Sequence, residues 1–276
     1  MRLRRLSSDL MRSPYQLLRY LQIVSGTPAG SSWSRAVRAL LFLCGLAATC
    51  GAEPHVAKAT AVGTEVFYAT SSGKTAMDKD AAGGNPFATA LIDILARPQF
   101  LLEDLPRELM TLTLKYSKQS QSPEVAKREA WPTLRLVPAG KGERWIALVL
   151  IVSHYDSLRS LPGALFDANR VARTLKEAGF ETQVALNLDL EEARHFLSKF
   201  AETSAGADLA LIYSTGHGVE ISGKSYLLPR DFSQDYGQAE ASARAITVDE
   251  IGAALQAKSA NLLFFGGCRN NPWQKP

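Results

Sequence analysis

The chain has 276 residues, of which 46% are hydrophobic, and this length allows one α/β domain of ordinary size with an appendage. The formal net charge of +4 is unevenly distributed, because residues 1–52 hold seven arginines and one acid, whereas residues 53–276 hold 24 basic and 26 acidic side chains. A body with a charge of −2 and no basic run is a poor electrostatic match for phosphate backbones, which argues against nucleic acid as a partner.

The basic N-terminal segment has the layout of an export signal. Arg35 and Arg38 precede an apolar stretch, residues 39–52, that ends in small side chains. This stretch is too short to span a bilayer comfortably, but it matches the apolar part of a secretory signal peptide. We therefore expect residues 1–52 to be a signal peptide, or an uncleaved anchor that binds the membrane through residues 39–52. The protein would then be exported (periplasmic or secreted) or membrane-anchored, and a cytoplasmic protein is the less favoured alternative.

The chain from residue 144 onward alternates between strands and helices. Apolar runs without polar alternation predict buried strands over residues 209–213 and 261–265, and strands are also predicted over residues 144–151 and 182–188. Apolar residues at helical spacing predict helices over residues 164–178, 193–201 and 247–256, the last opening with a capping box at Thr247 and Glu250. The small and polar residues 237–245 predict a loop. Together these elements predict an α/β fold of three layers, α/β/α, with a mostly parallel sheet.

Two of the predicted strands end in residues that carry chemistry. His217 follows one of them in Ser-Thr-Gly-His-Gly, and Cys268 follows another in Gly-Gly-Cys-Arg-Asn-Asn-Pro. If these strands are parallel neighbours, their carboxyl ends open onto one crevice, where a thiol beside an imidazole is a nucleophile for acyl transfer. The backbone amides of Gly218 and Cys268 are candidate donors to the developing oxyanion. The alternative is a histidine in a turn and a small buried cysteine without chemistry.

These motifs resemble those of the caspase-like cysteine peptidases, which include the metacaspases and their bacterial relatives. The His-Gly motif, the Cys-Arg-Asn-Asn-Pro motif and their separation of 51 residues match what is known of the family. Residues 144–151 are similar to its first strand, residues 161–168 to its substrate loop and residues 223–231 to the segment after its histidine. The resemblance covers residues 144–276 and implies a catalytic domain that cleaves peptide bonds with a Cys-His dyad, His217 and Cys268.

The resemblance also bears on the substrate. Asp167 matches one of two acids that line the metacaspase pocket for a basic residue before the scissile bond, although its simplest role is to cap the following helix. The second acid lies two positions before the cysteine, where this chain has Gly266. Cleavage after basic residues of a peptide or protein substrate therefore stays an open expectation.

No organic cofactor is expected, no histidine pair has metal-ligand spacing, and calcium activation is implied by family analogy alone.

Residues 63–137 are similar to the small subunit of the same family, which ordinarily follows the cysteine. In this chain they precede the catalytic piece, so the order is inverted. Three explanations stay open: circular permutation within one chain, the tail of a lost upstream copy joined to a truncated one, and pairing of the two pieces between chains. The first is favoured, because the linker 137–143 reaches about 23 Å when extended, whereas four strand spacings take about 19 Å. The fold is accordingly expected to be either permuted or incomplete.

Two other functional interpretations stay open. A catalytically inactive caspase-like scaffold or interaction protein would share the fold, and Gly266 and the inverted order favour it. A nucleotide-binding α/β protein is the weakest alternative, because the first strand of the catalytic piece is followed by residues 153–156, Ser-His-Tyr-Asp, rather than by a glycine-rich turn.

Overall fold

The computed structural model describes residues 63–274, apart from residues 82, 98, 126–134 and 137–141. These residues fall within one compact unit. The predicted signal or anchor segment, residues 1–52, lies outside the described residues. Within the described part of the chain, no helix is long and apolar enough to cross a membrane.

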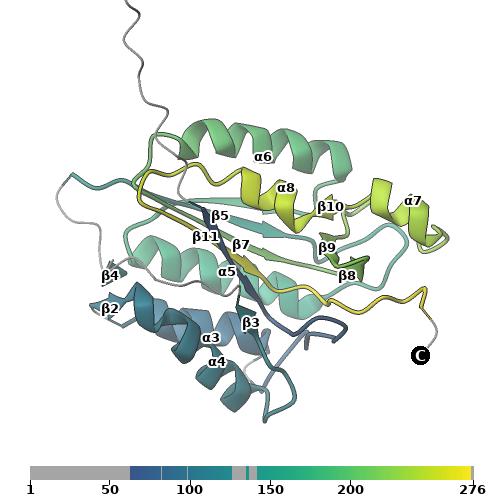
Figure 1. Cartoon of the computed structure of the whole chain (residues 1–276), viewed down its shortest axis with the longest axis horizontal. Helices are drawn as coiled ribbons and strands as arrows, with labels where there is room; N and C mark the ends of the chain where they lie inside the picture. The colour runs from purple at the N-terminus through teal and green to yellow at the C-terminus, as the bar shows by residue number, and fades with distance from the viewer. Residues whose placement is uncertain (1–62, 82, 98, 126–134, 137–141, 275–276) are drawn as a thin grey trace, which may run out of the picture. The chain divides into compact units, whose positions relative to one another are not determined.

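A six-stranded sheet with the order β3-β1-β11-β7-β5-β6 forms the centre of the molecule (Figure 1). Its members along the chain are β1 (Thr64–Tyr68), β3 (Glu124–Val125), β5 (Trp145–Ile151), β6 (Glu181–Leu186), β7 (Leu209–Thr215) and β11 (Ala260–Phe265). All neighbours are parallel except β3, which runs antiparallel to β1. Every residue of β5, β7 and β11 is buried, which explains why their sequences lack polar alternation.

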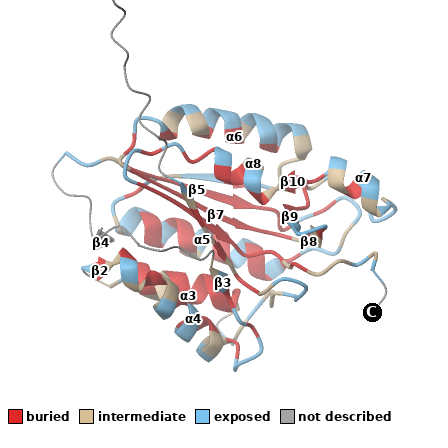
Figure 2. Cartoon of the chain, viewed as in Figure 1, coloured by how far each residue is buried: buried red, intermediate tan, exposed pale blue. Residues whose placement is uncertain are grey.

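Helices cover both faces of this sheet (Figure 1). One face carries α6 (Leu190–Ser204) and α8 (Val248–Ala253), and the other carries α5 (Pro162–Glu177), against which α3 (Pro86–Leu95) and α4 (Leu105–Tyr116) are layered. Figure 2 shows that buried residues fill the sheet and the inward faces of the helices. The predicted three-layer α/β/α fold with a mostly parallel sheet is confirmed.

Smaller elements lie at the margins of the sheet. Three short strands pair antiparallel in the order β10-β9-β8, and two others pair as β2 with β4. Their bounds are β8 (Gly218–Ile221), β9 (Lys224–Leu227), β10 (Ile246–Thr247), β2 (Phe100–Leu101) and β4 (Arg135–Leu136), and the remaining helices are η2 (Leu102–Asp104) and α7 (Gln238–Ala243). The strand β8 begins directly after His217, so this small sheet holds the histidine loop from one side.

Two local predictions are wrong. The expected loop over residues 237–245 contains α7, because its alanines, glutamine and glutamate are good helix formers and Gly237 precedes them in an extended conformation. Asp167 does not cap a helix, since α5 already begins at Pro162 and includes most of the expected substrate loop. Proline fits the first helical turn, where its missing N–H costs nothing. The capping box of Thr247 and Glu250 is present as predicted.

The N-terminal segment completes the same sheet. β1 pairs in parallel with β11 along its whole length, and β3 closes the outer side of β1. The rings of Phe67 and Phe264 stack across this pairing with 4.8 Å between their centroids. Both partners belong to one chain, so the structure has the intramolecular arrangement that circular permutation requires.

Arg269 ties the N-terminal segment to the strand that carries the cysteine. The residue is 6% exposed, and its guanidinium forms ion pairs with Glu220 at 2.8 Å and with Glu124 at 2.7 Å. It also donates to the carbonyl of Thr70 at 3.3 Å and lies 4.0 Å from the ring centroid of Tyr68. Because Glu124, Thr70 and Tyr68 all belong to the N-terminal segment, one buried cation links both parts of the sheet.

Replacing Arg269 with methionine is expected to lower the free energy of unfolding by about 3 kcal/mol, because the largely buried carboxylate of Glu220 loses its counter-charge. Urea unfolding of the full chain measures this change. The control is Arg107→Met. The Arg107 side chain is 67% exposed and pairs with Asp104 at the end of η2 and with Glu108 on α4, and such surface pairs contribute about 1 kcal/mol or less.

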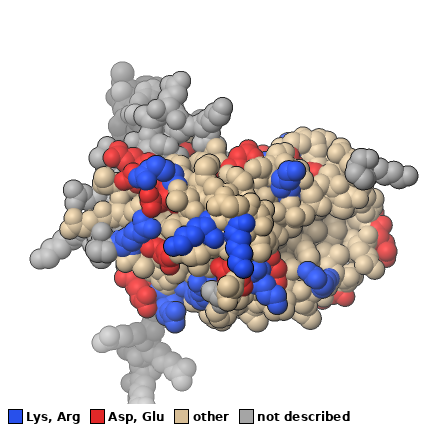
Figure 3. Space-filling view, turned by 90° about the horizontal axis from the view of Figure 1, so that it is seen from below, with Lys and Arg blue, Asp and Glu red and all other residues tan. Residues whose placement is uncertain are grey.

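Figure 3 views the molecule from the side on which α4 lies in Figure 1, and basic and acidic side chains are interspersed there. Surface pairs in such a setting are screened by water and salt. Equal losses of stability in Arg269→Met and Arg107→Met would contradict the central role given to Arg269.

Candidate active site

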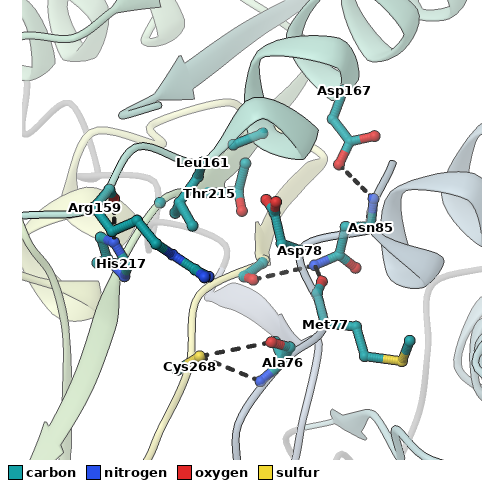
Figure 4. A pocket seen from close by; sticks show the side chains of 13 residues that line it. Ala76, Met77, Asp78, Asn85, Arg159, Leu161, Asp167, Thr215, His217 and Cys268 are labelled. Atoms are coloured by element: carbon teal, nitrogen blue, oxygen red, sulfur yellow. Dashed lines mark hydrogen bonds between the residues drawn. The ribbon is translucent and has the colours of Figure 1, made fainter. Parts of the chain in front are cut away.

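His217 and Cys268 follow neighbouring parallel strands. β7 and β11 pair as far as Ser214 opposite Phe265, and the N–H of Gly266 donates to the carbonyl of Ser214 at 2.7 Å. Each of the two functional residues comes three positions after this last pair. Both line the same pocket, of about 130 Å³ (Figure 4). The structure thus brings together the thiol and the imidazole that the sequence places at two strand ends.

Two glycines set the shape of the site. A Cβ atom at Gly218 would lie 2.5 Å from the carbonyl oxygen of Cys268 and 3.1 Å from its nitrogen, so only glycine fits this backbone contact. The two residues whose amides are the predicted oxyanion donors are therefore packed against each other. A Cβ atom at Gly266 would lie 2.7 Å from Oγ1 of Thr215. An acid at position 266 is excluded unless Thr215 moves, which explains why the expected second carboxylate is missing there.

The imidazole of His217 is held by a backbone carbonyl. Its Nε2 lies 2.7 Å from the carbonyl oxygen of Arg159, which only accepts hydrogen bonds. In the neutral ring the proton therefore sits on Nε2, and Nδ1 keeps its lone pair. Burial lowers the pKa of His217 below its ordinary value of 6.5, although the hydrogen bond to Arg159 opposes this change. A neutral imidazole with a free nitrogen is the form that a general base requires.

The thiol of Cys268 is half-buried and is not part of a disulfide. Its Sγ accepts a hydrogen bond from the backbone N–H of Ala76 at 3.3 Å. Burial raises the pKa of the thiol above its ordinary value of 9.0, and the contact with Ala76 offsets this only in part. The resting site therefore contains a neutral thiol and a neutral imidazole rather than an ion pair, so a proton must leave the sulfur before or during attack.

Acidic side chains line the pocket beside the thiol. Asp167, which is fully buried, accepts a hydrogen bond on Oδ2 from the N–H of Asn85 at 2.9 Å, while its Oδ1 has no hydrogen-bond partner among the described residues and forms an ion pair with Arg170 at 3.6 Å. Burial raises the pKa of Asp167 to about 7, and the nearby carboxylate of Asp78 adds to the increase. Asp78 lines the same pocket. A buried carboxylate oxygen that accepts no hydrogen bond is a favourable contact for a hydrogen-bond donor at the pocket wall.

Several pocket residues were not predicted from the sequence. Ala76, Asp78 and Asn85 come from the segment after β1, and Arg159 from the loop after β5. None belongs to a recognisable local motif, and the first three are remote from Cys268 along the chain. The one signal in the sequence is Gly163, because a Cβ atom there would lie 2.0 Å from the carbonyl oxygen of Asp78. That glycine marks a close approach but does not identify the partner.

The model of the caspase-domain family matches residues 144–275, which include both strand ends of this site. This part of the chain is therefore similar to caspase domains. The match does not include the segment that contributes Ala76, Asp78 and Asn85, so part of the wall of this pocket comes from outside the matched caspase domain.

Solved caspase structures are similar to part of the chain. Caspase-1 from Spodoptera frugiperda is 24% identical with a TM-score of 0.37, over 51% of this chain and 52% of that one. The structure titled pro-sf-caspase-1 is 22% identical with a TM-score of 0.37, over 54% of this chain and 56% of that one. The chain thus spans about half the length of each. No curated protein matches it.

The alkylation of Cys268 by iodoacetamide is expected to accelerate with rising pH through 9.0 and above, because burial raises the thiol pKa. The rate is measured by mass spectrometry of the peptide that contains Cys268, from below pH 6.5 upward. A rate that already reaches its plateau below pH 6.5 would indicate a thiolate stabilised by imidazolium and would contradict the neutral pair.

Asp167 is expected to make the protein less stable as pH rises. Its pKa is raised from 3.8 to about 7 in the folded state, so the folded state binds the proton more tightly and stability is lost between these two values. Asp167→Asn should remove this loss and be more stable than the wild type above pH 7, by at most about 4 kcal/mol. Urea unfolding at several pH values tests this. An unchanged pH dependence in the variant, matching that of the surface control Asp104→Asn, would refute it.

Proposed function

We propose that this protein is a cysteine endopeptidase in which His217 and Cys268 form the catalytic dyad. One observation carries the proposal: a free thiol and an imidazole with an unprotonated Nδ1 line one pocket at the ends of adjacent parallel strands. The caspase domain supports the same class of reaction, since it suggests a cysteine-dependent hydrolase. The packing of Gly218 against Cys268 supports an oxyanion site beside the sulfur.

The reaction proceeds in two stages. His217 takes the thiol proton through Nδ1 while the sulfur of Cys268 attacks the peptide carbonyl carbon, and the amides of Gly218 and Cys268 stabilise the negative oxygen. The imidazolium, oriented by the carbonyl of Arg159, then gives its proton to the leaving amine, and the acyl group stays on sulfur. Water, deprotonated by the same imidazole, attacks the thioester, releases the carboxylic acid and restores the thiol.

The pocket supports a basic residue before the scissile bond. Gly266 removes the acid expected from the family, but Asp78 contributes a carboxylate to the same wall as Asp167. The charge of Asp78 raises the pKa of both Asp167 and His217, so it acts on the whole pocket. A bound guanidinium or ammonium group would favour ionised Asp167. The exposed side chain of Arg159 extends into this pocket (Figure 4), and it must turn aside for a basic substrate.

Fluorogenic peptides with Arg, Lys or Asp before the cleavable bond test this function on the purified full-length protein. The Arg and Lys peptides are expected to be hydrolysed, with kcat/KM reduced at least about 1,000-fold in Cys268→Ala and His217→Ala. Asp167→Asn should lower kcat/KM on the Arg and Lys peptides about 10- to 100-fold, because the cationic side chain loses a buried partner. Turnover of the Asp peptide alone would overturn the basic preference while leaving the peptidase proposal intact.

The second candidate is an inactive caspase-like scaffold. The contact of Ala76 with the sulfur favours it, because the backbone of this segment occupies one side of the nucleophile. A peptidyl electrophile separates the two functions: modification of Cys268 that is lost in His217→Ala supports the enzyme. A folded protein that hydrolyses no peptide and leaves Cys268 unmodified supports the scaffold.

Other expectations stay predictions. Export or membrane association through residues 39–52 concerns a segment outside the described residues. Calcium activation has no matching ligand set in the described part of the chain, where no group of three or more His, Cys, Asp or Glu side chains is arranged to hold a metal ion.

A further inference from the structure

Tyr155 contacts His217 at two points. Its hydroxyl oxygen accepts a hydrogen bond from the backbone N–H of His217 at 2.7 Å, and its ring centroid lies 4.8 Å from that of the imidazole. The tyrosine is 4% exposed. A Cβ atom at Gly216 would lie 2.8 Å from the same hydroxyl oxygen, so the glycine before the histidine allows this approach. Backbone and side chain of His217 are thus both in contact with one buried residue.

The loop that carries Tyr155 is itself anchored. The side-chain oxygen of Asn187 accepts a hydrogen bond from the N–H of Ser153 at 2.8 Å. The N–H of Asp156 donates to the carbonyl of Arg230 at 3.0 Å, and the carboxylate of Asp156 pairs with the Arg230 guanidinium at 2.7 Å. These contacts on either side of Tyr155 fix its position relative to the sheet, so the tyrosine offers His217 a fixed support.

The hydroxyl of Tyr155 stays protonated. Burial is the main cause that raises its pKa, and a negative charge on Cys268 raises it further, while the hydrogen bond from His217 has the opposite effect. A protonated phenol cannot accept the thiol proton, so Tyr155 cannot replace the imidazole as general base. Any contribution of this residue to the reaction acts through His217.

We propose that Tyr155 is a positioning residue that, together with the carbonyl of Arg159, holds His217 so that Nδ1 is presented to the pocket lined by Cys268. This inference rests on the proposed peptidase function. The hydroxyl fixes the main chain of His217, the ring restricts the imidazole, and the Arg159 carbonyl sets the tautomer. Loss of the hydroxyl removes the hydrogen-bond partner of the backbone N–H of His217. The imidazole ring can then turn away from the orientation in which proton transfer is possible.

Tyr155→Phe keeps the ring and removes only the hydroxyl, and Tyr226→Phe is its matched control. Tyr226 is 6% exposed, belongs to β9 and does not line the pocket. On an Arg peptide, Tyr155→Phe is expected to lower kcat about 10- to 100-fold with KM changed less than about twofold. Tyr226→Phe should leave both constants close to those of the wild type. Equal kcat values in wild type and Tyr155→Phe would overturn the inference.

The pH dependence gives a readout that a general loss of stability would not produce. Burial lowers the pKa of His217, so a ring released toward water regains a pKa nearer 6.5, and the acid limb of kcat/KM moves to higher pH in Tyr155→Phe. The charges of Arg159 and Asp78 also act on the imidazole, which lines the same pocket as the thiol of Cys268, and the variant retains all three groups.

NMR titration of the imidazole separates failure of this inference from failure of the proposed function. A wild-type protein that neither hydrolyses peptides nor reacts with a peptidyl electrophile refutes the peptidase. The positioning role is still supported if the pKa of His217 rises in Tyr155→Phe but not in Tyr226→Phe. A folded Tyr155→Phe protein in which that pKa is unchanged refutes the positioning role, whatever the activity of the wild type.

Discussion

The site depends on the position of β11 between β7 and β1 in one sheet. Parallel pairing with β7 brings Cys268 to the same end of the sheet as His217. Parallel pairing with β1 brings the segment that follows β1, which includes Asp78, to that end as well. Since the carboxyl ends of parallel strands meet at one side of a sheet, three distant parts of the chain reach one pocket. Loss of β1 would leave the dyad without the wall that lies beside its sulfur.

Burial then decides the protonation states within this pocket. The same removal from water raises the pKa of Cys268, lowers that of His217 and raises that of Asp167 to about 7, so burial favours the neutral form of each. In the proposed peptidase, a substrate that brings a cation to Asp167 and a carbonyl to the sulfur would change this balance. The binding of such a substrate would thereby be linked to the ionisation that the proposed reaction needs.

Local patterns in the sequence predicted the strands and the residues at their ends, whereas the remaining pocket depends on long-range pairing. The apolar runs of β7 and β11 and the residues that end them are local signals, so the meeting of His217 and Cys268 in one pocket could be predicted from the sequence. Asp78 reaches the pocket only through the pairing of β1 with β11, which no local pattern encodes. The carbonyl of Arg159 was missed for another reason. Every residue has a backbone carbonyl, so the residue type does not indicate which carbonyl contacts the histidine.

The inverted order of the two pieces does not prevent assembly of this site, because strand pairing depends on hydrogen-bond register and packing rather than on chain order. β1 needs only an apolar strand edge to pair with, and β11 provides one whose Phe264 stacks on Phe67. Along the chain, Cys268 and Ala76, which meet in this pocket, are 192 residues apart. Arg269 links the parts of the sheet that carry them, through Glu124 on one side and Glu220 on the other. The geometry of the pocket should therefore be sensitive to the loss of this buried cation.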